Sequence, residues 1–190
     1  MFHTARLAAI VLDQPGGVDD LLASFALSLR DRGWCVRGVV QSSMRSMSGN
    51  MYPAVVDLDS GHLHPLYYYD QGRSSAGNET GMFEMLALFR RIVCEGADLV
   101  LMNRFSVAEA EGQGVTAEMM LLAQDGIPLL TVVERAQFPA WQAFAGDAGL
   151  VLPPSMERLN NWIFSVWREA SAAASAAILE TECRPSRMMS

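Results

Sequence analysis

Short apolar runs alternate along the chain with longer segments in which apolar residues recur every three or four positions. Residues 5–12 form a mostly apolar run that stops at the turn-forming residues 13–17. Residues 18–32 follow with helical spacing and end beside Gly33, a typical helix terminator. Residues 36–40 form the next apolar run. A strand, a glycine-rich turn, a helix and a second strand within roughly 35 residues have the size of a βαβ unit.

The same alternation returns in the second half of the chain. The spacing predicts helices at residues 82–95, 115–124, 141–145 and 155–177, and strands at residues 98–102, 128–133 and 150–152. Strands that are buried on both faces of a parallel sheet have continuous apolar runs of this kind. We therefore predict an α/β fold with three layers and a mostly parallel sheet. It forms a single domain over residues 1–180, and residues 181–190 form a flexible tail.

The stretch of residues 41–81 breaks this pattern because it is rich in Ser, Gly, Asn and Tyr. Two strand-like pieces lie on either side of residues 59–61, whose sequence Asp-Ser-Gly is typical of a hairpin turn. We predict an insertion with a β-hairpin around residues 50–70, which decorates the sheet or forms an antiparallel edge. A mobile loop follows at residues 70–80. The exposed edge of such a hairpin is a surface through which a homodimer can form.

Composition and charge narrow the classes of partner. Hydrophobic residues make up 51% of the 190 residues and charged residues 18%, which favours a well-filled core over disorder. The net charge of −7 repels a polyanion, so we expect no duplex nucleic acid as partner. No apolar run reaches the ~18 residues that a membrane helix needs, so we expect no membrane partner either.

The three cysteines do not form a metal-binding pattern. The chain has no CxxC pair and no Cys/His cluster. Cys35 and Cys94 stand among apolar residues, and we predict that both are buried structural thiols. Reduced thiols and the lack of a signal-peptide pattern favour a cytoplasmic location.

The turn after the first predicted strand resembles a phosphate-binding loop only in part. Ligands collect at the carboxyl ends of parallel strands, and backbone amides at the start of a helix attract anions. The turn residues that we expect to bind a nucleotide or an oxyanion in this way are Gln14, Pro15, Gly16 and Gly17. A Walker motif also needs a Lys for the phosphates and a Ser or Thr for magnesium. Val18, Asp19 and Asp20 stand at those positions, so we do not expect tight binding of magnesium-nucleotide by that route.

Three interpretations of this turn remain open. In the first, the acidic residues only stabilise the positive end of the helix dipole, and no ligand binds. In the second, the turn is an anion site that has lost part of the phosphate-binding motif or has taken on another role. In the third, Asp13, Asp19 and Asp20 hold magnesium, because hard cations favour oxygen ligands.

A second polar cluster follows the strand predicted at residues 98–102. Asn103 stands where a working P-loop hydrolase has the acidic residue that holds magnesium through water. Arg104 can contact a carboxylate or an oxyanion with two parallel hydrogen bonds. Glu109 or Glu111 can serve as a general base. The alternative is structural: Glu111 helps to organise the next helix, and Arg104 pairs with Glu109.

Three segments together resemble a known family. They are GGVDDLLASFALSLRDRGWCVRGVVQ, GADLVLMNRFSVAEAEGQG and GIPLLTVVERAQFPAWQAFAG. They are similar to the bacterial domain of unknown function 2478, over about residues 7–154, and the Asn-Arg-Phe motif at residues 103–105 is the most specific part. Members of that family resemble small P-loop nucleoside triphosphatases, and their genes often neighbour molybdate-transport genes. The resemblance implies a P-loop-hydrolase-like fold and a link to molybdenum metabolism, with no established activity.

The chain also departs from the family at a few positions. Relatives are richer in arginine at residues 41–49, where this chain has only Arg45. Arg104 stands where lysine is common in the family, and Ser106 where glycine is common.

Three hypotheses of function follow. The favoured one is a binding protein with little or no catalysis and an accessory role in molybdenum metabolism. Its small anionic ligand, a nucleotide or a molybdate-like oxyanion, sits over residues 14–17 and is surrounded by Gln41, Arg45, Asn103 and Arg104. The alternative is an atypical nucleoside triphosphate hydrolase, in which magnesium is held by Asp19 or Asp20 and water is oriented by Glu109 or Glu111. A third hypothesis is a protein-interaction module that uses the Met- and Tyr-rich insertion.

Overall fold

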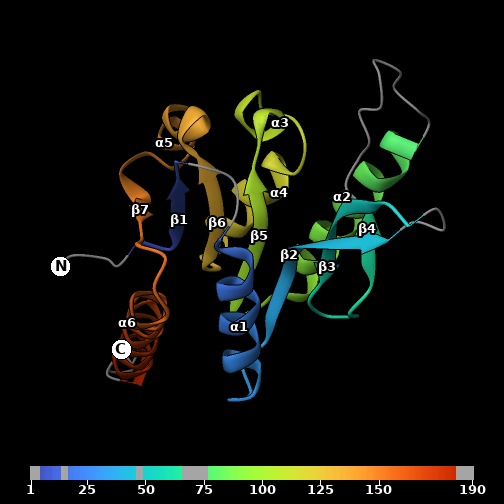
Figure 1. Ribbon diagram of the computed structural model, residues 1–190. Helices are drawn as coiled ribbons and strands as arrows, with labels where there is room; N and C mark the ends of the chain where they lie inside the picture. The colour runs from blue at the N-terminus through green and yellow to red at the C-terminus, as the bar shows by residue number, and fades with distance from the viewer. Residues whose placement is uncertain (1–4, 14–16, 46–48, 66–76, 183–190) are drawn as a thin grey trace, which may run out of the picture.

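A single seven-stranded sheet organises the molecule. The computed structural model describes residues 5–13, 17–45, 49–65 and 77–182 (Figure 1). The strands are β1 (Leu7–Leu12), β2 (Val36–Arg45), β3 (Met51–Asp57), β4 (Leu63–Pro65), β5 (Leu99–Phe105), β6 (Leu129–Glu134) and β7 (Gly149–Val151). They lie in the order β4-β3-β2-β5-β6-β1-β7. The strands β2, β5, β6, β1 and β7 pair in parallel, and β3 and β4 add an antiparallel edge. The predicted α/β fold with a mostly parallel sheet is confirmed.

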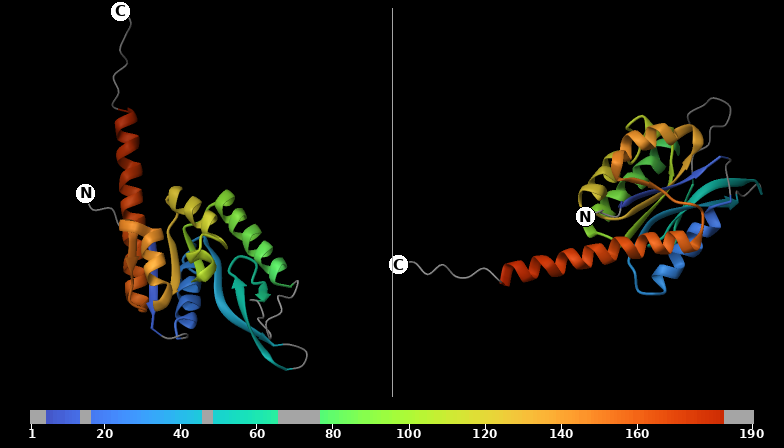
Figure 2. Two further views of the ribbon diagram at one scale, coloured as in Figure 1. Left: turned by 90° about the horizontal axis from the view of Figure 1, so that it is seen from above. Right: turned by 90° about the vertical axis from the view of Figure 1, so that its left-hand side faces the viewer.

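Helices cover both faces of this sheet. They are α1 (Asp19–Arg30), α2 (Gly77–Glu95), α3 (Val107–Ala110), α4 (Thr116–Gln124), α5 (Phe138–Ala145) and α6 (Met156–Glu182). The helices α1 and α6 pack on one face, whereas α2, α4 and α5 pack on the other, which makes the three predicted layers (Figure 2). The last helix, α6, continues beyond the body of the molecule and ends later than residue 177, where the spacing predicted its end.

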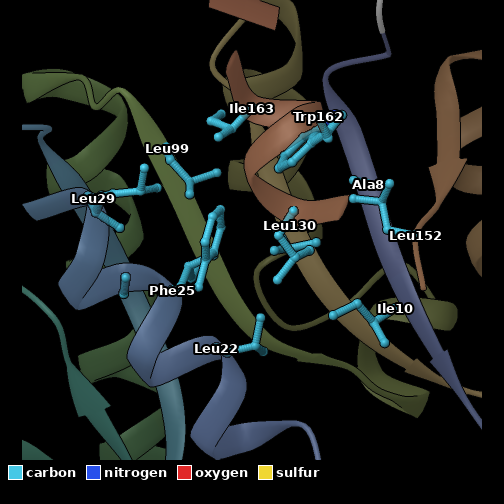
Figure 3. Close-up of a cluster of buried hydrophobic side chains, with 14 of the residues drawn as sticks. Ala8, Ile10, Leu22, Phe25, Leu29, Leu99, Leu130, Leu152, Trp162 and Ile163 are labelled. Carbon is cyan, nitrogen blue, oxygen red and sulfur yellow. The ribbon is translucent and has the colours of Figure 1, made fainter. Parts of the chain in front are cut away.

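The strands β1, β2, β5 and β6 supply side chains to both cores. On the α1 face, Ala8 and Ile10 of β1 belong to the same core cluster as Phe25 of α1 and Trp162 of α6 (Figure 3). Ala9, between them in sequence, points to the opposite core under α2, α4 and α5. Because successive side chains of a strand point to opposite faces, a strand covered on both sides must be apolar throughout. This explains why the apolar runs located the central strands correctly.

The strand β2 is longer than predicted and belongs to two partnerships. Its first residues pair with β5, and this ladder ends at the pair Gly38 and Leu101. From Val39 onward β2 pairs only with β3, up to the pair Arg45 and Met51. Residues 41–45, predicted as the beginning of the insertion, are therefore part of a strand. They escaped detection because the pairing with β3 stabilises a stretch whose side chains need not be apolar.

The predicted hairpin around residues 50–70 is present as β3 and β4. Its turn depends on the buried Asp57, whose carboxylate accepts hydrogen bonds from the Asp59 amide at 2.9 Å and the Ser60 hydroxyl at 2.6 Å. The insertion thus forms an antiparallel edge, the second of the two predicted arrangements. The helix α2 begins at Gly77, inside the segment predicted as a mobile loop, and residues 70–76 lie outside the described residues.

Two predictions about the thiols were wrong. Cys35 and Cys94 are both exposed, not buried. Cys35 lies in the connection between α1 and β2, and Cys94 lies in the last turn of α2, so their apolar sequence neighbours turn inward without them. Within the described part of the chain, no helix combines the length and the apolar character needed to span a membrane.

Candidate anion site at the carboxyl edge of the sheet

The carboxyl ends of three neighbouring parallel strands form the candidate site. β1, β5 and β6 end at Leu12, Phe105 and Glu134, and α1 begins beside them at Asp19. Ligands of open α/β sheets bind at this edge. Gly17, at the end of the turn that leads into α1, has a φ of 80°, which favours glycine. Of the other predicted turn residues, Gln14, Pro15 and Gly16 lie outside the described residues.

An ion pair joins α1 to β5 across this edge. The Nη2 atom of Arg104 donates to both carboxylate oxygens of Asp19, at 3.1 and 3.3 Å. Both side chains are partly buried, with 18% of Arg104 and 28% of Asp19 exposed. The structural alternative in which Arg104 pairs with Glu109 is therefore wrong.

A β-bulge explains why Arg104 faces α1. Met102 pairs with Thr131 and Phe105 pairs with Val133, so β5 advances three residues while β6 advances two. Met102 and Phe105 both contribute to the core under α2, α4 and α5. Strict alternation along β5 would put Arg104 on that same face. The extra residue sends it to the opposite face instead, where Asp19 lies, and bulges often re-aim side chains next to functional sites.

One nitrogen of the Arg104 guanidinium is left over. Its Nη1 atom is buried and has no hydrogen-bond acceptor among the residues that the structure describes. A buried donor without an acceptor costs about 1–3 kcal/mol, and more when the group is charged. An anion that contacted Nη1 would remove this cost.

A second arginine lies at the same edge. Nε of Arg135, directly after β6, donates to Asp13 Oδ1 at 2.8 Å, and its guanidinium lies 5.8 Å from the ring centre of Phe138. Arg135 and Asp13 are 60% and 77% exposed, and exposed pairs contribute about 0–1 kcal/mol. Arg135 was not predicted as a site residue, although it follows a predicted strand whose carboxyl end had to lie at this edge.

Glu109 has a structural environment. Its Oε2 accepts hydrogen bonds from the amide and the hydroxyl of Ser106, which together with the Ala108 amide form a capping box at the start of α3. Its Oε1 lies 3.4 Å from the Val115 amide nitrogen. Glu111 is exposed at the end of α3. The proposed catalytic roles of both carboxylates stay predictions, and Glu111 is the freer of the two.

The structure does not gather all the residues predicted around the ligand. Gln41 follows Val39 by two residues and pairs with Val55, and both valines belong to the core on the α2 side, so Gln41 faces away from α1. Arg45 lies at the far end of β2, seven residues beyond the last pair with β5, or about 23 Å along the strand. Asn103 lies within the bulge of β5.

The two residues predicted to hold metal lie next to each other in the first turn of α1. Asp19 is engaged with Arg104, and Asp20 is exposed. Across the described ranges, no group of three or more His, Cys, Asp or Glu side chains could hold a metal ion. Magnesium at this place stays a prediction, and in this structure Asp20 is the one of the two carboxylates that is not paired with Arg104.

Comparison with known proteins places the chain in a family. A family model described as "Protein of unknown function (DUF2478)" matches residues 7–162, which include the turn, the bulge and both arginines. The chain belongs to this family. The resemblance identified from the sequence is therefore confirmed.

Two known proteins are similar to this DUF2478 member, one in sequence and one in fold. The "Molybdenum import ATP-binding protein ModC 2" of Bradyrhizobium diazoefficiens is 30% identical over 173 residues, which are 88% of this chain and 18% of that protein. The chain thus spans less than a fifth of its relative. The solution structure of a human cancer-related nucleoside triphosphatase matches with a TM-score of 0.58 at 15% identity, over 88% of this chain and 98% of that one. This likeness shows the fold alone, and it confirms the P-loop-hydrolase-like architecture.

Proposed function

We propose that the chain binds a small anion at the carboxyl edge of its sheet without hydrolysing it efficiently. The ligand is either the phosphate group of a nucleotide or a molybdate-like oxyanion. The observation that carries this proposal is the Arg104 guanidinium, held by Asp19 and left with a buried Nη1 atom that lacks an acceptor. Oxyanions offer several acceptor oxygens, and arginine binds them with short charge-assisted hydrogen bonds.

Weak or absent hydrolysis follows from the residues around the turn. Val18 stands where a Walker lysine would contact the phosphates, so a positive charge is lacking from the place where negative charge develops. Removing one such stabilising group from an enzyme typically costs about 3 kcal/mol of transition-state stabilisation. Both carboxylate oxygens of Glu109, one of the two candidate bases, accept hydrogen bonds from the backbone, Oε2 at the start of α3 and Oε1 just before α4.

An accessory role in molybdenum metabolism is the second part of the proposal. Support comes from the relative, whose printed name refers to molybdenum import and ATP binding. That protein contains a region similar to this chain within a much longer polypeptide. We propose that the present chain serves the same metabolism by binding either the oxyanion or the nucleotide.

Ligand-dependent stabilisation tests the proposal. The unchanged protein and two variants, Arg104→Gln and Arg168→Gln, would be melted with molybdate, tungstate, sulfate, phosphate, ATP or GTP, with and without magnesium. Arg168 is the matched control because it lies on α6 and bonds only within that helix in the described structure. A ligand at 100 times its dissociation constant adds about 2.7 kcal/mol. In a domain of this size, that free energy raises the melting temperature by roughly 5–11 °C.

The pattern of shifts identifies the anion. Shifts with molybdate and tungstate alone support the oxyanion, whereas shifts with ATP or GTP support the nucleotide phosphate. In either case we expect Arg104→Gln to lose the shift and Arg168→Gln to keep it. A chain that no anion stabilises would refute anion binding. Sustained phosphate release from ATP, abolished by Glu111→Gln, would instead establish the hydrolase and overturn the claim of inefficient hydrolysis.

A further inference from the structure

The ion pair between Asp19 and Arg104 uses only one side of the guanidinium. Nη2 donates to both oxygens of the carboxylate, while Nη1 makes no hydrogen bond to the residues that the structure describes. In the common bidentate arrangement, two guanidinium nitrogens share the two oxygens of one carboxylate. Here the carboxylate fixes the arginine and still leaves a terminal nitrogen for another acceptor.

Asp19 is well placed to restrain this arginine. It lies in the first turn of α1, which is anchored to the core by the buried Val18 and Leu22. The pair is much less exposed than the neighbouring pair of Arg135 and Asp13, so solvent screens it less. A free arginine side chain samples many rotamers, and an anion that bound it would have to remove that freedom.

We infer that Asp19 is a positioning residue for anion binding: its carboxylate holds Arg104 through Nη2 so that Nη1 stays available to the anion. This inference rests on the proposed function, because it concerns the same site. It also predicts a change in anion affinity, on removal of Asp19, that is opposite in sign to the change that simple charge repulsion predicts. A carboxylate beside an anion repels it, so electrostatics alone predicts tighter binding once Asp19 is removed. Positioning predicts weaker binding.

The neighbouring aspartate supplies a matched control. Asp20 lies one residue further along α1, carries the same charge near the same helix terminus and is exposed. Asp19→Ala and Asp20→Ala therefore remove the same charge and the same interaction with the helix dipole. Only the first removes the partner of Arg104.

The experiment measures dissociation constants by titration calorimetry, with molybdate and with ATP as separate probes. We expect Asp19→Ala to raise the dissociation constant about tenfold, since the arginine must then be ordered at the moment of binding. In magnesium-free buffer, where the predicted metal-binding role of Asp20 makes no contribution, we expect Asp20→Ala to leave the dissociation constant unchanged or to lower it. In the Arg104→Gln background, Asp19→Ala should weaken binding no further, because the residue that it positions is already gone.

Three results would overturn the inference. Binding by Asp19→Ala that is as tight as in the unchanged chain, or tighter, would show that the carboxylate only repels the anion. Equal losses from Asp19→Ala with and without Arg104 would show a general structural effect. In both cases the proposed function survives if Arg104→Gln alone weakens binding. If the unchanged chain binds neither molybdate nor ATP, both the proposed function and the positioning role of Asp19 are refuted.

Discussion

The contact between β2 and β5 leaves no room for a side chain at Gly38, and this makes a sharp stability prediction. Gly38 is the last residue of β2 that pairs with β5, and its φ is 104°. A Cβ atom added there would lie 1.9 Å from the carbonyl oxygen of Leu101 and 2.9 Å from its carbonyl carbon. Both atoms belong to backbone, so they cannot move away as the end of a side chain could. We expect Gly38→Ala to force the two strands apart.

The expected loss combines two effects. The left-handed backbone conformation costs an alanine about 1–2 kcal/mol. Separation of the strands weakens the short ladder from Val36 to Gly38, at about 1 kcal/mol for each hydrogen bond that is lost. The sum for Gly38→Ala is about 3–5 kcal/mol, a large part of the 5–15 kcal/mol that stabilises a typical protein.

Gly33 is the matched control. Its φ is 85°, and a Cβ atom added there meets no described heavy atom within 4 Å. Gly33→Ala therefore carries only the backbone cost of about 1–2 kcal/mol. Urea unfolding followed by far-ultraviolet circular dichroism measures the free energy of unfolding of both variants. In thermal unfolding, the melting temperature should fall by roughly 6–20 °C for Gly38→Ala and by roughly 2–8 °C for Gly33→Ala. Equal losses for the two variants would refute the steric reasoning.

Three further predictions concern the core, the cap and the thiols. Phe25→Ala, which empties a fully buried position between α1 and the sheet, should cost about 3–5 kcal/mol in urea unfolding, and a loss under 1 kcal/mol would contradict the packing described. Glu109→Ala should cost about 1–3 kcal/mol because the capping box and the Val115 amide lose their acceptor, and an unchanged melting temperature would show that the box contributes nothing. In a Cys183→Ser variant, a thiol reagent should titrate both Cys35 and Cys94 without denaturant, whereas titration of neither would mean that they are buried.

The fold was largely predictable because its signals are local. The central strands are covered on both faces, so their apolar runs stand out from the amphipathic helices around them. The second half of β2 had no such signal. Ser42 and Ser43 lie there in register with Ala54 and Pro53 of β3, and their extended conformation depends on a partner that comes later in the chain.

The candidate site was predictable only in outline. The carboxyl-edge rule directed attention to the turn before α1 and to the end of β5, and the structure brings the start of α1 next to the end of β5. It did not reveal that Arg104 pairs with Asp19, because these residues are 85 positions apart and their contact depends on the bulge in β5. Gln41 and Arg45 were predicted to surround the ligand because they follow the second predicted strand. Alternation along β2 turns Gln41 to the opposite face of the sheet, and the length of β2 carries Arg45 away from Arg104.

The bulge also sets how the strand responds to insertions and deletions. Between Met102 and Phe105, β5 has one residue more than its neighbour β6. Loss of Asn103 would restore one-to-one pairing and leave Arg104 and Phe105 on their present faces. Gain of one residue at the same place would require a larger bulge, or it would keep those faces and shift the partner of Phe105 by two residues, past the end of β6. Within this segment, the strand pairing therefore accommodates a deletion more easily than an insertion.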